Sequence, residues 1–151
     1  MQINSDGVDD EEWGYARDNL IASLGKIIRN HNNLINVNEL VPKWINSLPI
    51  MYDTREAQLQ HTMLMEMILS NNHLVFGLNN INLPKIVRIC GKIYKTEKST
   101  EGCDNYIECV VLNLLNNNET NAILMKTESE SEEKMKRKIG LILNSVKSKQ
   151  K

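Results

Sequence analysis

The sequence has few aromatic residues, few prolines, few cysteines and no long apolar run. Aromatic residues make up 5% of the 151 residues, and there are only three Pro. No stretch approaches the ~20 consecutive apolar residues of a membrane-spanning helix, and no strand-like alternation of apolar and polar residues is present. The core must therefore be built from Leu, Ile, Val and Met, which suits helices packed on helices.

The three cysteines, Cys90, Cys103 and Cys109, exclude two further classes. Their odd number and the absence of a CxxC spacing argue against a disulfide framework and against a zinc site. We expect reduced thiols inside a cell. No nucleophile motif, phosphate-binding loop or metal-ligand spacing occurs. The sequence therefore predicts no catalytic, cofactor or metal site, and the chain is not expected to be an enzyme.

Charge is balanced overall but unevenly distributed. The formal net charge is −1, which gives no overall field to attract nucleic acid or membrane. Acidic residues gather at 9–12 and 128–133, and basic residues follow at 134–151. An acidic stretch before a basic one predicts a helix from about residue 130, because this order complements the helix dipole. Without interleaved aromatic residues, the basic tail is expected to be a solvated helix end with no direct nucleic-acid contact.

An internal repeat organises the middle of the chain. Residues 38–45 (NELVPKWI) are similar in sequence to residues 80–87 (NINLPKIV), and Pro42 and Pro84 lie 42 residues apart. Helix pairs that recur at about 40–47 residues are typical of HEAT and armadillo arrays. The repeat predicts an all-α fold, a HEAT-repeat solenoid fragment with antiparallel helix pairs, about two full repeats and flanking helices. Such arrays bind partners along their surfaces.

Apolar periodicity and turn residues divide the chain into four parts. These are a frayed or disordered N-terminus (1–10), a HEAT-repeat segment (11–116), a loop (117–129), and a terminal capping helix with a basic tail (130–151). Within the repeat segment, helices are expected at about 10–30, 36–48, 53–70, 82–96 and 104–116, with an apolar connector at 71–82. Asp53 and Asp104 are expected to cap the third and fifth of these helices, and Trp44 on the second is expected to pack in the core.

The first expected helix has a long apolar stripe, which we expect to face the core. The stripe consists of Trp13, Ala16, Leu20, Leu24, Ile27 and Ile28. This helix resembles the second helix of a pair whose first helix is missing, so the chain is interpreted as a piece of a longer protein. An alternative expectation is that this helix, lacking its partner, drives dimerisation through Trp13.

Several segments resemble the C-terminal HEAT repeats of the importin beta superfamily. They are residues 20–27 (LIASLGKI), 36–44 (NVNELVPKW) and 48–49 (LP). A further block, residues 70–86, resembles the importin beta-3 (karyopherin beta-3) branch through its SNNH start and its NLPKI end. The resemblance covers about residues 13–115 and fades over 116–151.

The resemblance implies a nuclear transport receptor. Such receptors carry cargo proteins with basic nuclear-localisation signals, contact Phe-Gly nucleoporins at the nuclear pore, and shuttle between cytoplasm and nucleus. Binding of the GTPase Ran in its GTP form expels the cargo. The matching motifs are structural, so no ligand residue of the family is carried over.

Three acidic residues are candidates for protein binding: Asp18, Glu66 and Glu108. They lie on the expected second helices, which line the concave side of HEAT arrays, and could face a Lys/Arg-rich cargo. The competing explanation is ordinary solvated charge. The alternative function is a HEAT or armadillo scaffold or adaptor unrelated to nuclear transport. A small all-α enzyme is a third class, for which the sequence names no acid or base.

Overall fold

A computed structural model describes residues 7–31 and 33–151. The described residues form α-helices joined by short turns, with one 3-10 helix and no strand, which confirms the all-α class. The elements are α1 (Gly7–Asn30), α2 (Val37–Ser47), α3 (Thr54–Ser70), α4 (Asn72–Phe76), η1 (Leu78–Asn80), α5 (Leu83–Ile93), α6 (Glu101–Leu115), α7 (Asn118–Glu130) and α8 (Glu133–Lys149).

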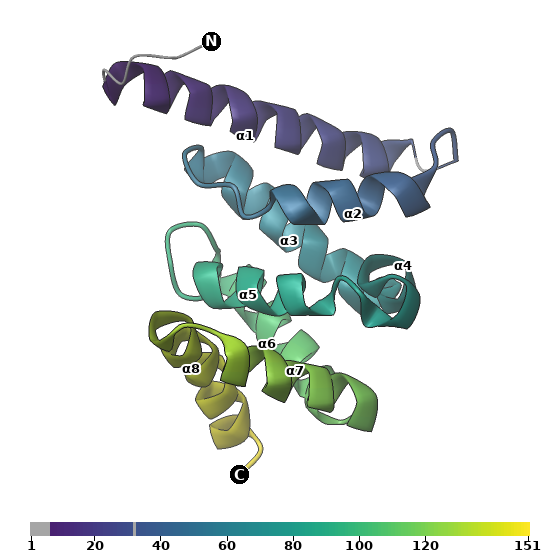
Figure 1. Cartoon of the computed structure of the whole chain (residues 1–151), viewed down its shortest axis with the longest axis vertical. Helices are drawn as coiled ribbons and strands as arrows, with labels where there is room; N and C mark the ends of the chain where they lie inside the picture. The colour runs from purple at the N-terminus through teal and green to yellow at the C-terminus, as the bar shows by residue number, and fades with distance from the viewer. Residues whose placement is uncertain (1–6, 32) are drawn as a thin grey trace.

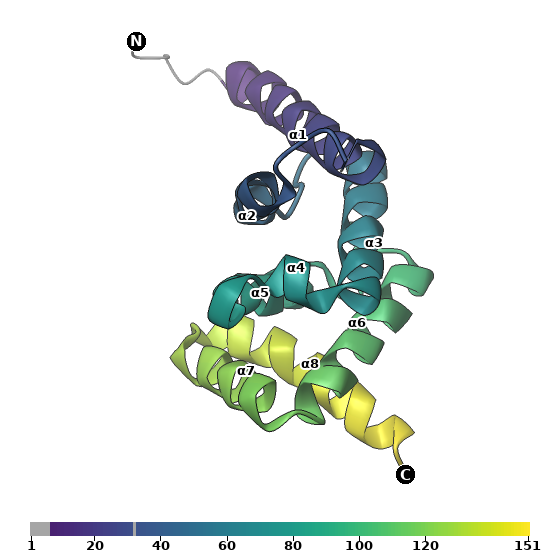
Figure 2. The ribbon, with the colours of Figure 1, turned by 90° about the vertical axis from the view of Figure 1, so that its right-hand side faces the viewer.

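The helices alternate between short and long and stack in two layers (Figures 1 and 2). The short helices α2, α5 and α7 have 11, 11 and 13 residues, and each is followed by a long helix. Successive long helices pack on one another in the order α1, α3, α6 and α8, while α2 contacts α5 and α5 contacts α7. Helix α1 and the C-terminus lie at opposite ends of the long axis (Figure 1).

Two segments that were expected to lack helical structure are helical. Residues 7–10, expected to be frayed or disordered, begin α1, while residues 1–6 lie outside the described residues. The segment 117–129, expected to be a loop, is occupied by α7. The Asn117 side chain accepts hydrogen bonds from the backbone N–H groups of Glu119 and Thr120 and so caps this helix. Only Leu124 and Thr127 of α7 are buried. The sequence of this segment therefore has little apolar periodicity that would indicate a helix.

The N-terminal cap of α3 is the predicted residue, whereas that of α6 is not. Asp53 caps α3 as expected, since its carboxylate accepts a hydrogen bond from the Glu56 N–H at 3.0 Å. The predicted cap of α6, Asp104, is wrong. The Thr100 hydroxyl accepts from the Cys103 N–H at 3.0 Å instead, and the helix begins at Glu101. The Asp104 carboxylate accepts from the Ser99 hydroxyl, which orders the turn before α6.

The junction of α1, α2 and α3 is held by a buried polar chain. Trp44, which is fully buried as expected, donates from Nε1 to Gln60 Oε1 at 3.1 Å. Gln60 Nε2 donates to the Ala22 carbonyl at 3.3 Å. Gly25 lies against both side chains, so α1 approaches this junction at a position where only a hydrogen fits. The junction joins the first helix to the rest of the stack.

Gly25→Ala is therefore expected to be destabilising by about 1–3 kcal/mol, the range for overpacked cores. A Cβ at this position would overlap Gln60 Oε1 and lie 2.8 Å from Trp44 Nε1. Urea unfolding followed by circular dichroism measures the change. Gly140→Ala in α8 is the control, because nothing lies within 4 Å of its Cβ and helix propensity favours Ala by about 0.5–1 kcal/mol. Equal effects of both substitutions would contradict the close packing at Gly25.

The predicted orientation of the first helix is wrong for most of its apolar stripe. Ile28 of that stripe is buried as expected, together with Ile21 and Ala22, whereas Trp13 and Leu20 are 63% and 73% exposed. The helix is apolar on two sides, and hydrophobic periodicity alone does not say which side packs. Because Gly25 and the neighbouring small side chains allow close approach, the less apolar side faces α2 and α3.

The two tryptophans should differ sharply in access to solvent. In Trp44→Phe, the remaining Trp13 is expected to be quenched readily by iodide, since it is exposed. In Trp13→Phe, the buried Trp44 is expected to resist quenching and to emit at a shorter wavelength. A protected Trp13 in dilute solution would mean that the outer stripe of α1 is covered, for example by a second copy.

Candidate functional site

Asp18, predicted to face cargo, is a buried structural residue. Its side chain is fully buried. Oδ2 accepts from the backbone N–H groups of Tyr52 and Asp53 at 2.7 and 2.8 Å, and Oδ1 accepts from Met51 at 3.5 Å. The carboxylate therefore fastens α1 to the turn before α3. The prediction that it contacts a partner is wrong, because none of its surface reaches solvent.

Glu108 is mostly buried, and its carboxylate is occupied by hydrogen bonds within the structure. Its side chain is 12% exposed and accepts from the Tyr94 hydroxyl at 2.6 Å, from the Ser145 hydroxyl at 2.8 Å and from Lys149. Burial acts to raise the pKa of Glu108, but these hydrogen bonds outweigh it and hold that pKa below its usual range. The residue ties the end of α5 and the middle of α6 to α8.

Glu66 alone of the three candidates remains open to solvent. It lies on α3, with its side chain 44% exposed, and Oε2 is 3.9 Å from an Arg29 guanidinium nitrogen. An exposed pair of this length contributes little to stability. The structure therefore does not bring the three acidic candidates together into one surface.

His61 is a buried histidine to which sequence reasoning assigned no role. Its Nε2 accepts from the Ile50 N–H at 3.1 Å, and Nδ1, as the protonated nitrogen, donates to the Lys98 carbonyl at 2.8 Å. Desolvation by burial lowers the pKa of His61 to about 4. The ring is thus neutral near pH 7 and bridges the turn before α3 to the turn before α6.

This lowered pKa predicts a loss of stability in mild acid. Between about pH 6.5 and about pH 4, His61 binds a proton in the unfolded chain but not in the folded state. The free energy of unfolding therefore falls as the pH drops through this range. Above pH 6.5 this group contributes no pH dependence. The full loss is up to about 3 kcal/mol. Urea unfolding at several pH values measures it, and His61→Gln should abolish this part of the slope. An unchanged slope in the variant would contradict the assignment.

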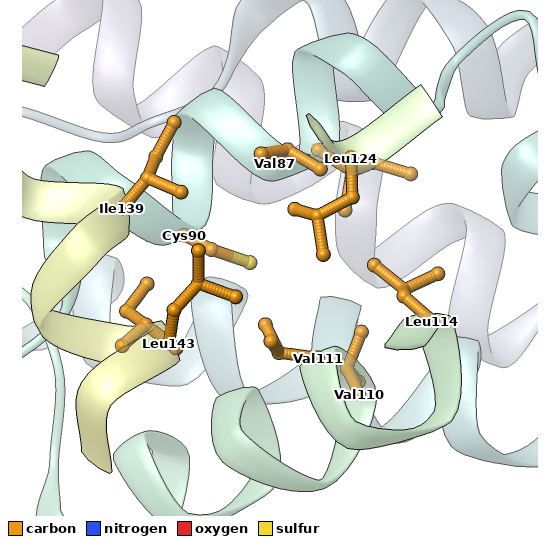
Figure 3. Close-up of a pocket in the computed structure, with 10 residues that line it drawn as sticks. Val87, Cys90, Val110, Val111, Leu114, Leu124, Ile139 and Leu143 are labelled. Atoms are coloured by element: carbon orange, nitrogen blue, oxygen red, sulfur yellow. The ribbon is translucent and has the colours of Figure 1, made fainter. Parts of the chain in front are cut away.

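The apolar space among the last four helices is part of the core (Figure 3). It measures about 10 Å³, roughly the volume that one water-sized probe needs. Its lining is apolar, and burial raises the pKa of the Cys90 thiol to about 12, so no thiolate is available there. The lining residues are Ile86, Val87, Cys90, Val110, Val111, Leu114, Leu124, Ile139, Ile142 and Leu143. The space is too small for a substrate or cofactor.

The outer side of α5 is basic. Lys85, Arg88 and Lys92 follow one another at spacings of three and four residues, which places them on one side of the helix. Partial burial lowers the pKa of Lys85, and the charges of Lys92, Arg88 and Arg17 lower it further. These cations are therefore close enough to repel one another.

A groove continues this basic region where α5 ends and α8 begins, on the left in Figure 1. It has a volume of about 350 Å³, and Met51 and Met135 line it together with charged side chains. We call the α5 cations, the groove lysines and Arg17 of α1, whose charge acts on Lys85, the basic surface. It comprises Arg17, Lys85, Arg88, Lys92, Lys98, Lys134 and Lys138.

Few carboxylates neutralise the basic surface. Among the described residues, Lys98 is its only member in an ion pair, with Glu97 at 3.0 Å. Glu97 and Glu132 are the only acidic residues that line the groove. The sequence showed three of these cations between 83 and 93, but the groove depends on how α8 packs against α5.

No three His, Cys, Asp or Glu side chains in residues 7–31 and 33–151 are grouped to hold a metal ion. No helix in the same residues is long and apolar enough to cross a membrane. No known protein-family model matches the chain.

Proposed function

We propose that this chain is a protein-binding segment of a HEAT-repeat scaffold. The observation that carries the proposal is the order of packing, in which long helices contact the next long helix and short helices the next short one. Stacked helix pairs of this kind present extended surfaces to partner proteins. The near-absence of enclosed space in the C-terminal core fits a binding scaffold better than a small-molecule enzyme.

The more specific proposal is a C-terminal segment of a nuclear import receptor. Its support is the sequence resemblance over about residues 13–115, including the repeated Pro-Lys pairs, of which the first lies inside α2 at Pro42 and the second at the start of α5 at Pro84. The proposed partners are cargo with basic nuclear-localisation signals, Phe-Gly nucleoporins and Ran, and the proposed location is the nuclear pore, cytoplasm and nucleus. Of the three acidic candidates, Glu66 is the one left for basic cargo.

One observation favours the second candidate, a scaffold or adaptor unrelated to nuclear transport. The region formed by the α5 cations and the groove lysines is basic, and a basic region does not complement basic cargo. Such a scaffold would use the same helix stack for acidic partners, and its binding would not respond to Ran.

Capture from cell extract, with and without GTP-locked Ran, separates the two candidates. The chain is immobilised, bound proteins are identified, and GTP-locked or GDP-bound Ran is then added. The import-receptor proposal predicts selective release by the GTP form. Retention of the same proteins under both forms would reject that proposal and favour the Ran-independent scaffold.

A further inference from the structure

The α5 part of the basic surface carries a charge repulsion that no ion pair among the described residues relieves. Helix α5 contains no acidic residue, and Lys85, Arg88 and Lys92 share one side of it. Like charges at such spacings destabilise a helix. Partial burial lowers the pKa of Lys85, and the charges of Lys92, Arg88 and Arg17 lower it further. A negatively charged partner would relieve this repulsion.

The groove at the end of α5 provides a concave site beside these charges. Its volume of about 350 Å³ lies within the range of roughly 300–1,000 Å³ typical of ligand sites. Four lysines and two glutamates line it, which leaves two net positive charges. Met51 and Met135 supply an adaptable apolar lining, and the lysine stems add apolar walls. Helix α8 begins here, and its amino end adds positive potential.

We infer that the basic surface binds an acidic peptide segment of a partner protein, with an apolar side chain of that segment in the groove. The inference deepens the proposed function, on which it rests for the partner being a protein. Carboxylates along the peptide would pair with Lys85, Arg88 and Lys92. A nucleic acid fits less well, because no aromatic ring among the described residues lines the groove to stack on a base.

Binding of a designed acidic peptide tests the inference. The probe is a fluorescein-labelled peptide of about twelve residues, in which Glu alternates with Ser on both sides of a central Leu-Leu pair. Fluorescence anisotropy is expected to show saturable binding that weakens as salt rises. A peptide with Lys in place of Glu should not bind, and Ser in place of the two Leu should weaken binding.

Two charge-reversal variants localise the binding. Lys92→Glu with Lys138→Glu changes the groove, whereas Lys147→Glu with Lys151→Glu makes the same change in net charge on the C-terminal tail. The groove variant should weaken binding by at least about tenfold, and the tail variant by less than about twofold. Lys92→Gln alone, at an exposed position, should weaken binding in the same direction if the double variant fails to fold.

Three results would overturn the inference. They are no binding of the acidic peptide, equal weakening by the groove and tail variants, or tighter binding of a single-stranded oligonucleotide of equal charge. The experiment contains no Ran and no Phe-Gly peptide. Peptide binding therefore survives a failed import-receptor test, and a failed peptide test leaves Ran-dependent release to be judged separately.

Discussion

Trp44→Ala is expected to lower the free energy of unfolding by about 3–5 kcal/mol, the usual range for removing a large buried aromatic side chain. The side chain is fully buried between α1 and α3, so the substitution leaves a cavity at the junction of three helices. It also removes the hydrogen bond to Gln60 Oε1, and the buried Gln60 then lacks a partner on that side. Urea unfolding measures the loss.

Trp44→Phe is the matched control for this substitution. It keeps most of the apolar volume and removes the indole N–H, so it should cost clearly less than the alanine variant. A loss below about 1 kcal/mol in Trp44→Ala would mean that the three-helix junction does not hold the N-terminal half together.

Asp18→Ala has the second-largest expected effect, a loss of about 2–5 kcal/mol. The substitution removes the acceptor of two short backbone hydrogen bonds, from Tyr52 and Asp53. These hydrogen bonds are partly buried, and a donor left without an acceptor costs up to roughly 1–3 kcal/mol. The turn that precedes α3 would lose its attachment to α1, which thermal unfolding would report as a lower Tm.

Two controls separate burial from charge at Asp18. Asp18→Asn keeps one carbonyl oxygen in place and should cost less than Asp18→Ala. Glu12→Ala removes an exposed acid from the same helix and should change stability by no more than about 0.5 kcal/mol. If Asp18→Ala lowered the free energy of unfolding no more than Glu12→Ala does, Asp18 would be a surface residue. It would then again be a candidate for contact with a partner.

The local parts of the fold could be read from the sequence. Asp53 and Glu56 predicted the start of α3, and its end at Ser70 follows from the Asn residues after it. The helix α2 ends before Pro49, as the proline predicts. These signals act within a few residues of the boundary, so no knowledge of tertiary packing was needed.

The misread features depend on contacts between distant residues. Asp18 was expected to face a basic partner because it is acidic and lies on an expected second helix, but its hydrogen-bond partners lie 33–35 residues further along the chain. The orientation of α1 follows from Gly25, which makes room for Gln60 and Trp44. Neither effect produces a hydrophobic pattern. The basic groove likewise needs α8 to pack against α5, which the charges alone did not predict.

Binding of a Phe-Gly repeat peptide to the isolated chain is the most direct test of the proposed import-receptor function. The peptide is titrated into the labelled chain, and the same peptide with Ser in place of each Phe is the control. The account predicts saturable binding of the Phe-Gly peptide and none of the control. Equal binding of both peptides, or of neither, would contradict a nuclear import receptor and leave the chain as a helical scaffold for other partners.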